Sequence, residues 1–102
     1  TSCTIVLIGA KSHERKYLDW EIKATLDKSH ALVGIILPGH SKNPAGEIIV
    51  PDRFLDNHKS GYAVWSHWNG LTAQQLTQLI DIAIAKPKSQ IDNARPMRQR
   101  NG

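Results

Sequence analysis

The chain has 102 residues, with 13 lysines and arginines against 9 aspartates and glutamates, which gives a formal net charge of +4. This length fits one domain, and a content of 40 % apolar and 22 % charged residues excludes an intrinsically disordered chain. No apolar run approaches the roughly 18 residues that a membrane-spanning helix needs, so we expect no membrane partner. The single cysteine, Cys3, excludes an internal disulfide and a cysteine-based zinc site, and favours a cytoplasmic location.

The first elements are predicted to be a strand and a helix. The run Thr4–Ile8 is apolar without alternation and ends at Gly9, which is typical of a strand covered on both faces in a parallel sheet. A helix is predicted from His13 to about Lys28, because Ser12 is a good cap and apolar residues follow at helical spacing.

A second buried strand and a long loop are predicted next. The strand Ala31–Leu37 is again apolar throughout, and Gly34 at its centre indicates that another group packs closely against it. Residues 38–60 are rich in glycine, proline, asparagine and charge, and are predicted to form a loop with a single helical turn at Pro51–Leu55. A loop of this length in a small domain favours a functional role.

The last elements are predicted to be a short strand and a helix. Tyr62–Trp65 is the strand, and Thr72-Ala-Gln-Gln75 is a capping box, so the helix is expected to run from there to about Lys86. Strands that alternate with helical segments indicate an α/β protein with a parallel sheet.

Few residues indicate chemistry by their spacing alone. The sequence contains no GxGxxG, phosphate-binding loop or GxSxG motif, and its five histidines lack metal-ligand spacing, so no metal is predicted. Trp65, His67 and Trp68 lie near a strand end, where they could bind a ring or serve as core and edge cover. Glu21 flanks an apolar helix face, which is compatible with a partly desolvated carboxylate or an ordinary surface residue.

The C-terminal segment is the basic part of the chain. From Lys86 onward there are five basic residues and one acid, Asp92, whereas the preceding part is neutral. We treat residues 1–87 as the domain and residues 88–102 as a basic tail, either solvated or serving as a patch for a polyanion. No aromatic residue lies among its arginines to stack on bases, so a nucleic-acid partner is not expected.

Three segments resemble one known family. Residues 4–12 (TIVLIGAKS), 15–22 (RKYLDWEI) and 32–38 (LVGIILP), with Asp56-Asn57 and residues 93–97 (NARPM), resemble the TIR-like family that includes the TIR-like subunit of the Thoeris anti-phage defence system. The resemblance covers most of the chain. It implies a flavodoxin-like, three-layer α/β fold with a parallel sheet, of which this chain holds the last three strands and their helices.

The resemblance also implies an activity. Many proteins of this kind cleave the nicotinamide–ribose bond of NAD, and Thoeris-type members make a cyclic ADP-ribose isomer as a signal. NAD is then a substrate, and no cofactor is expected. The glutamate of the family's "WEI" motif corresponds to Glu21, the expected catalytic residue. Tyr17, Trp20, Gly9 and Ala10 are the expected substrate-binding residues.

The chain also departs from the family pattern. Members of the family have a strand, a helix, a second strand and a loop before the "LIG" strand, and these are not among the 102 residues. On that reading Thr4–Ile8 is an apolar edge strand, and we expect a homo-oligomer through it. The alternative is an inactive fragment or a non-catalytic protein–protein interaction module, since a fold does not determine a function.

Overall fold

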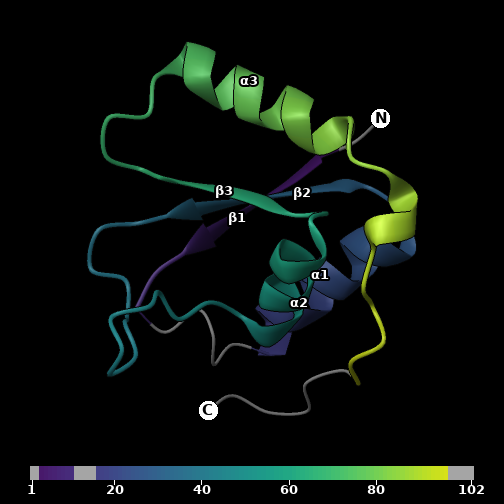
Figure 1. Cartoon of the computed structure of the whole chain (residues 1–102), viewed down its shortest axis with the longest axis horizontal. Coiled ribbons are helices and arrows are strands. Elements are labelled where there is room, and N and C mark those ends of the chain that lie inside the picture. The colour runs from purple at the N-terminus through teal and green to yellow at the C-terminus, as the bar shows by residue number, and fades with distance from the viewer. Residues whose placement is uncertain (1–2, 11–15, 97–102) are drawn as a thin grey trace.

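The fold is a parallel sheet with helices on both faces. The computed structural model describes residues 3–10 and 16–96 (Figure 1). Its strands are β1 (Cys3–Ile8), β2 (Ala31–Ile36) and β3 (Val64–His67), in the order β1-β2-β3, and both neighbouring pairs are parallel. Its helices are α1 (Lys16–Asp27), α2 (Asp52–Ser60) and α3 (Ala73–Ile84), followed by a 3₁₀ helix at Lys88–Gln90. The predicted α/β class is confirmed.

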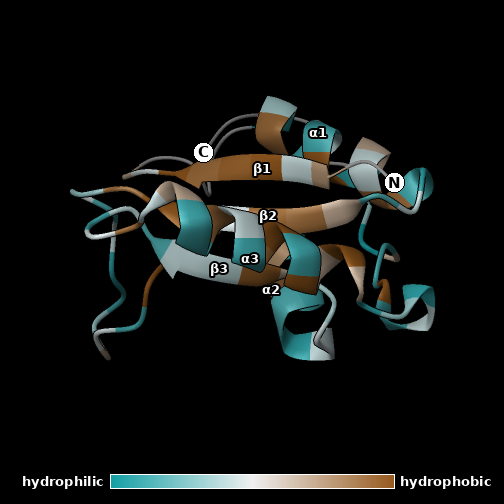
Figure 2. Cartoon of the chain, turned by 90° about the horizontal axis from the view of Figure 1, so that it is seen from above, coloured by the Kyte–Doolittle hydropathy of each residue, from teal (hydrophilic) through white to brown (hydrophobic). Residues whose placement is uncertain are grey.

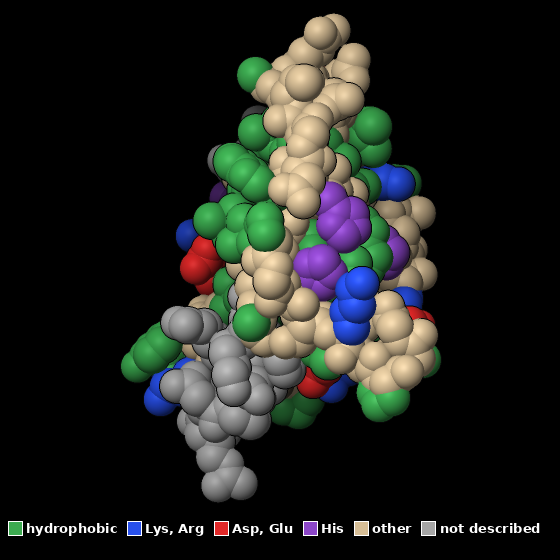
Figure 3. All heavy atoms as spheres, turned by 90° about the vertical axis from the view of Figure 1, so that its left-hand side faces the viewer, with side chains coloured by type: hydrophobic (Ala, Val, Ile, Leu, Met, Phe, Trp, Pro, Cys, Tyr) green, Lys and Arg blue, Asp and Glu red, His purple; other side chains and the backbone are tan. Residues whose placement is uncertain are grey.

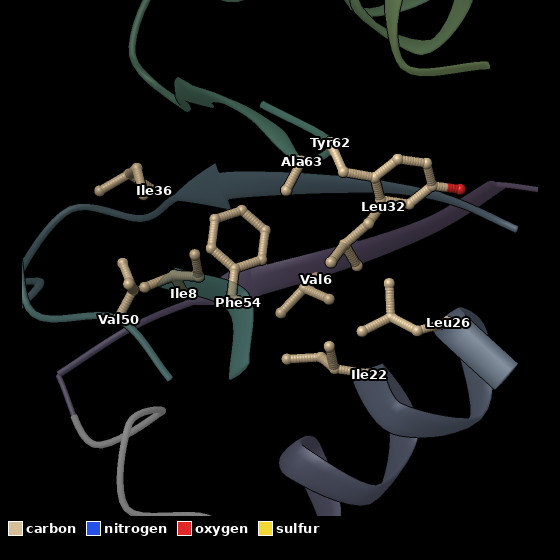
Figure 4. Packing of buried hydrophobic residues seen from close by; sticks show 10 residues of the cluster. All are labelled: Val6, Ile8, Ile22, Leu26, Leu32, Ile36, Val50, Phe54, Tyr62 and Ala63. Atoms are coloured by element: carbon tan, nitrogen blue, oxygen red, sulfur yellow. The ribbon is translucent and has the colours of Figure 1, made fainter. Parts of the chain in front are cut away.

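The two faces of the sheet have separate cores. Helices α1 and α2 cover one face, where the core cluster includes Val6, Ile22 and Phe54. Helix α3 covers the other face, where Val33 and Ile35 of β2 pack against Ala83. Figure 4 shows the first cluster, with Phe54 pointing toward the side chains of the strands. Strand β2 is buried along its whole length because it lies between the other strands and under helices on both sides.

Strand β1 differs from its prediction on one face. Its residues alternate in burial, with Val6 and Ile8 buried, while Ile5 is 40 % and Leu7 is 54 % exposed. Figure 2 shows β1 as an apolar strand at the edge of the sheet, with α3 lying mainly over the other strands. The prediction that both faces of this strand are buried is therefore wrong. An apolar run without alternation shows that both faces of a strand are suited to burial. Whether both faces are buried depends on which helices pack on the strand.

Helix α2 occupies part of the segment that was predicted to be a loop. It begins after Pro51 and continues to Ser60, well beyond the single turn predicted at 51–55. Gly61 ends it in the left-handed conformation, with φ +93°, and its N–H donates to the carbonyls of Asn57 and His58. The helix was missed because two of its buried positions are polar, Arg53 and Asn57, which masks the apolar face.

Helix α3 begins at the predicted capping box. The Gln75 N–H donates to Thr72 Oγ1 at 3.1 Å, and the Thr72 N–H donates to Gln75 Oε1 at 3.0 Å. These bonds satisfy donors at the helix start that no intrahelical carbonyl can reach. The helix ends at Ile84, close to the predicted end at Lys86. Strand β3 lies two residues later than predicted, because the buried Tyr62 and Ala63 precede it.

A buried arginine ties the C-terminal segment to α1 and α2. The Arg53 guanidinium is fully buried and donates through Nε to Asp19 Oδ1 at 2.9 Å. Its two other nitrogens donate to Asn93 Oδ1 at 2.8 Å and to the Pro96 carbonyl at 3.0 Å. We call residues 91–96 the strap. One side chain thus joins α2, α1 and the strap.

Further polar contacts hold the strap. Asn57 Nδ2 donates to the Asp92 carbonyl at 2.7 Å, and the Asp92 N–H donates to Asn57 Oδ1 at 2.8 Å. Arg95 binds both carboxylate oxygens of Asp56, at 2.9 and 3.0 Å. These bonds hold residues 91–96 of the predicted basic tail against α1 and α2, and residues 97–102 lie outside the described residues. The domain boundary at residue 87 stays a prediction.

Candidate functional site

Three of the residues predicted for the site lie together on α1. Tyr17 and Trp20 are one helical turn apart and pack edge to face, with ring centroids 5.0 Å apart. Lys16 Nζ lies over both rings, 5.1 Å from the centroid of Tyr17 and 5.6 Å from that of Trp20. Glu21 follows on the same outer side of the helix and is exposed. The residues buried beneath the helix are others, namely Asp19, Ile22, Thr25 and Leu26.

This geometry makes Glu21 accessible without enclosing it. The side chain lies on the exposed flank of the helix, beside the buried face. The backbone carbonyl of Glu21 accepts a hydrogen bond from Thr25 Oγ1 at 2.9 Å, within the same helix. Neither of the two pockets described below is lined by Glu21. The described residues therefore provide a reachable carboxylate beside an aromatic pair.

The other two predicted residues lie at the end of β1. Gly9 is half-buried and Ala10 is exposed. The carbonyl of Ala10 accepts a hydrogen bond from Ser41 Oγ at 2.6 Å. This contact joins the end of β1 to the loop after β2, at the edge of the sheet where parallel strands end. The predicted cap Ser12 and the predicted helix start at His13 lie outside the described residues. The roles assigned to these five residues stay predictions.

A pocket lies beside α2, away from Glu21. It has a volume of about 610 Å³ and is formed by the turn at residues 43–48, the outer side of α2 and the middle of β3. We call it the Trp65 pocket, and it is lined by Asn43, Gly46, Glu47, Ile48, Leu55, His58, Lys59 and Trp65. Its volume lies within the range of about 300–1,000 Å³ that is usual for small-molecule sites.

Ring contacts form the inner wall of this pocket. The rings of His58 and Trp65 are 4.0 Å apart between centroids, and Phe54 stacks behind at 6.2 Å from Trp65. Burial lowers the pKa of His58 from its usual value because desolvation penalises the imidazolium. His58 is therefore a neutral donor and acceptor at physiological pH. Figure 3 shows histidine side chains gathered around apolar ones on the side of the molecule toward which the strands run.

A second pocket lies between β3 and the start of α3. Its volume is about 430 Å³, and it is lined by Ser66, His67, Asn69, Gly70, Leu71, Gln75 and Leu79. The His67 ring also contacts His40, at 5.6 Å between centroids. Trp68 is 55 % exposed, whereas Trp65 packs on the α2 side. Trp65 and Trp68 thus belong to different surfaces. Trp65 packs against the core and also lines the Trp65 pocket.

The chemistry of the remaining candidates is limited. In residues 3–10 and 16–96, no group of three or more histidine, cysteine, aspartate or glutamate side chains is placed to hold a metal ion. Burial raises the pKa of the Cys3 thiol, which disfavours the nucleophilic thiolate. Of the helices in these same residues, none is long and apolar enough to cross a membrane.

Sequence reasoning missed most of the Trp65 pocket. Leu55 was assigned to a single helical turn, and Ile48, His58 and Lys59 were assigned to the loop of residues 38–60. A helical spacing was available in the sequence, since Phe54 and His58 are four residues apart and precede Gly61 as a helix stop. That signal would have placed His58 beside the core.

The fold defines the class of protein as α/β, with a parallel sheet between helices, as expected for part of a flavodoxin-like or TIR-like domain. The family described as "Thoeris protein ThsB, TIR-like domain" matches residues 1–42 of the chain. These residues cover β1, α1 and β2 and include Glu21. The match confirms the family resemblance for the motifs within residues 1–42, and for Asp56-Asn57 and residues 93–97 the resemblance stays a prediction. No curated protein and no solved structure matches the chain significantly.

Proposed function

We propose that this TIR-like protein cleaves NAD and forms a cyclic ADP-ribose signal in cytoplasmic anti-phage defence. The observation that carries the proposal is the match of residues 1–42 to the Thoeris TIR-like family, which includes the glutamate of the "WEI" motif. The exposure of Glu21 supports it, because the carboxylate is open to a substrate. Tyr17 and Trp20 beside it offer ring surfaces for a nucleotide.

In this proposal Glu21 stabilises positive charge on the ribose. The bond between the nicotinamide nitrogen and the ribose carbon breaks, and nicotinamide leaves as a neutral molecule. The remaining ribose carbon has oxocarbenium character, which a nearby carboxylate stabilises. A nucleophile within the ADP-ribose then adds to that carbon, closes the ring and releases its proton to water. Glu21 also holds the ribose hydroxyl groups as hydrogen-bond acceptor.

Replacing Glu21 by glutamine is expected to reduce NAD turnover by at least about 100-fold, because the developing charge loses its counter-charge. The measurement is the release of nicotinamide from NAD by the natural gene product, followed by chromatography. The matched control is Glu47→Gln, which changes another exposed glutamate that lies on the turn at residues 43–48. Equal turnover in the two variants would remove Glu21 from the chemistry.

A second candidate function is a non-catalytic TIR-like interaction module. The position of Glu21 on an exposed helix face, outside both pockets, favours it. An activated natural gene product that releases no nicotinamide would support this second function over the first.

We propose further that the protein acts as a homodimer through β1. Ile5 and Leu7 form an exposed apolar stripe on this edge strand, and a second copy carries the same stripe, so a two-fold axis would cover both at once. Helix α1 packs against β1 from the other face of the sheet. The proposed interface therefore lies on the face of β1 opposite to α1.

The variant Leu7→Lys is expected to weaken this dimer by about tenfold or more, since a charge replaces apolar contact in both copies. Sedimentation equilibrium over a range of protein concentrations measures the change. Ile82→Lys is the control, because Ile82 is 53 % exposed but belongs to α3. A wild-type protein that stays monomeric at every concentration, or equal weakening by both substitutions, would argue against the β1 interface.

A further inference from the structure

The Trp65 pocket has walls that are fixed before any ligand arrives. On one side Asn43 Oδ1 accepts hydrogen bonds from the N–H groups of Ala45 and Glu47, at 3.0 and 2.9 Å. The Asn43 N–H also donates to the carbonyl of Glu47 at 2.9 Å, which closes the turn. On the other side α2 is anchored to the core by Phe54. A preformed pocket loses little conformational entropy when a ligand binds.

The inner surface of the pocket suits a flat apolar group. Trp65 and His58 contribute rings, and Ile48 and Leu55 are partly buried side chains that extend the core to this surface. Gly46 opens the turn, with empty space where a side chain would be. Planar rings bury much apolar area against such a wall and interact with the aromatic faces.

The polar groups of the pocket have opposite charges on opposite walls. Lys59, on α2, makes no side-chain hydrogen bond or ion pair within the described residues, so its ammonium is available. Glu47, on the turn, uses one carboxylate oxygen, which accepts from Asn43 Nδ2 at 3.1 Å. A ligand that fits both groups carries an anionic end toward Lys59 and a hydrogen-bond donor toward Glu47.

We propose that the Trp65 pocket binds a small planar aromatic anion that has a ring N–H or O–H donor. The ring lies against Trp65, the anionic group pairs with Lys59, and the donor reaches Glu47. The pocket is separate from Glu21, so this inference stands whether or not the protein cleaves NAD.

Indole-3-acetate is the probe, because it combines a planar ring, an N–H donor and a carboxylate. Titration of the isotope-labelled chain is followed by the indole N–H signals of its three tryptophans. The Trp65 signal is expected to shift and saturate, while the signals of Trp20 and Trp68 serve as internal references. The probe tryptophol has the same ring without the carboxylate, and its binding is expected to be weaker.

Two charge-removing variants give the decisive comparison. Lys59→Gln is expected to weaken indole-3-acetate binding about threefold to fivefold, the effect of one exposed ion pair. Lys42→Gln removes the same charge from the neighbouring turn without touching the pocket, and it is expected to bind like the wild type. The proposal is overturned by no saturable shift at millimolar probe, by equal effects of the two variants, or by equally tight binding of tryptophol.

Discussion

Replacing Arg53 by methionine is expected to lower the free energy of unfolding by about 3–5 kcal/mol. The guanidinium is fully buried and bonds to Asp19, which is itself only 6 % exposed. The substitution removes the guanidinium that bonds to this buried carboxylate, and the strap loses its bonds through Asn93 and Pro96. Because small domains are stable by only about 5–15 kcal/mol, this is a large fraction of the total. Urea unfolding measures the change.

Two comparisons identify the cause of the loss. The double variant Asp19→Leu/Arg53→Met removes both charges, so it is expected to be more stable than Arg53→Met alone. The exposed pair of Lys23 and Asp27, at 2.9 Å, is the control, and Lys23→Gln is expected to cost no more than about 0.5 kcal/mol. A double variant less stable than Arg53→Met would mean that the buried charge is not the main effect.

Replacing Gly34 by alanine is expected to destabilise the protein by about 1–3 kcal/mol through overpacking. A Cβ atom at this position would lie 2.5 Å from Phe54 Cζ and 3.0 Å from Ile8 Cδ1, which is too close for carbon atoms. The site is in the middle of the buried strand β2, so neither the strand nor the ring is free to move away. The midpoint and slope of urea unfolding report the change.

The Phe54→Leu background tests the stated contact directly. Leucine lacks the atoms nearest to the new methyl group, so Gly34→Ala is expected to cost less in Phe54→Leu than in the wild type. The difference between the two costs is the coupling free energy, expected at about 0.5–3 kcal/mol. Costs that are equal in both backgrounds would show that Phe54 is not what excludes a side chain at position 34.

The candidate site was only partly predictable from the sequence. The family motif led to Glu21, and the structure places it on the same outer helix face as Tyr17 and Trp20, but its catalytic role stays a prediction. The exposure of Glu21 was not predictable, because it depends on which elements pack beside α1. The Trp65 pocket was not predicted, since its walls come from three segments that approach only in the folded chain.

What the sequence by itself determined is local or depends on a single strand. Apolar runs predicted β1 and β2, and the Thr72 capping box predicted the start of α3, because these signals act within a few residues. Gly34 predicted a close neighbour, because a glycine inside a buried strand indicates that no side chain fits there. The tertiary structure alone decided that Arg53 is buried, that Leu7 is exposed and that the strap packs on α1 and α2. These outcomes depend on contacts between residues more than 30 positions apart, such as Arg53 with Asp19, and on which sheet edge the helices leave uncovered.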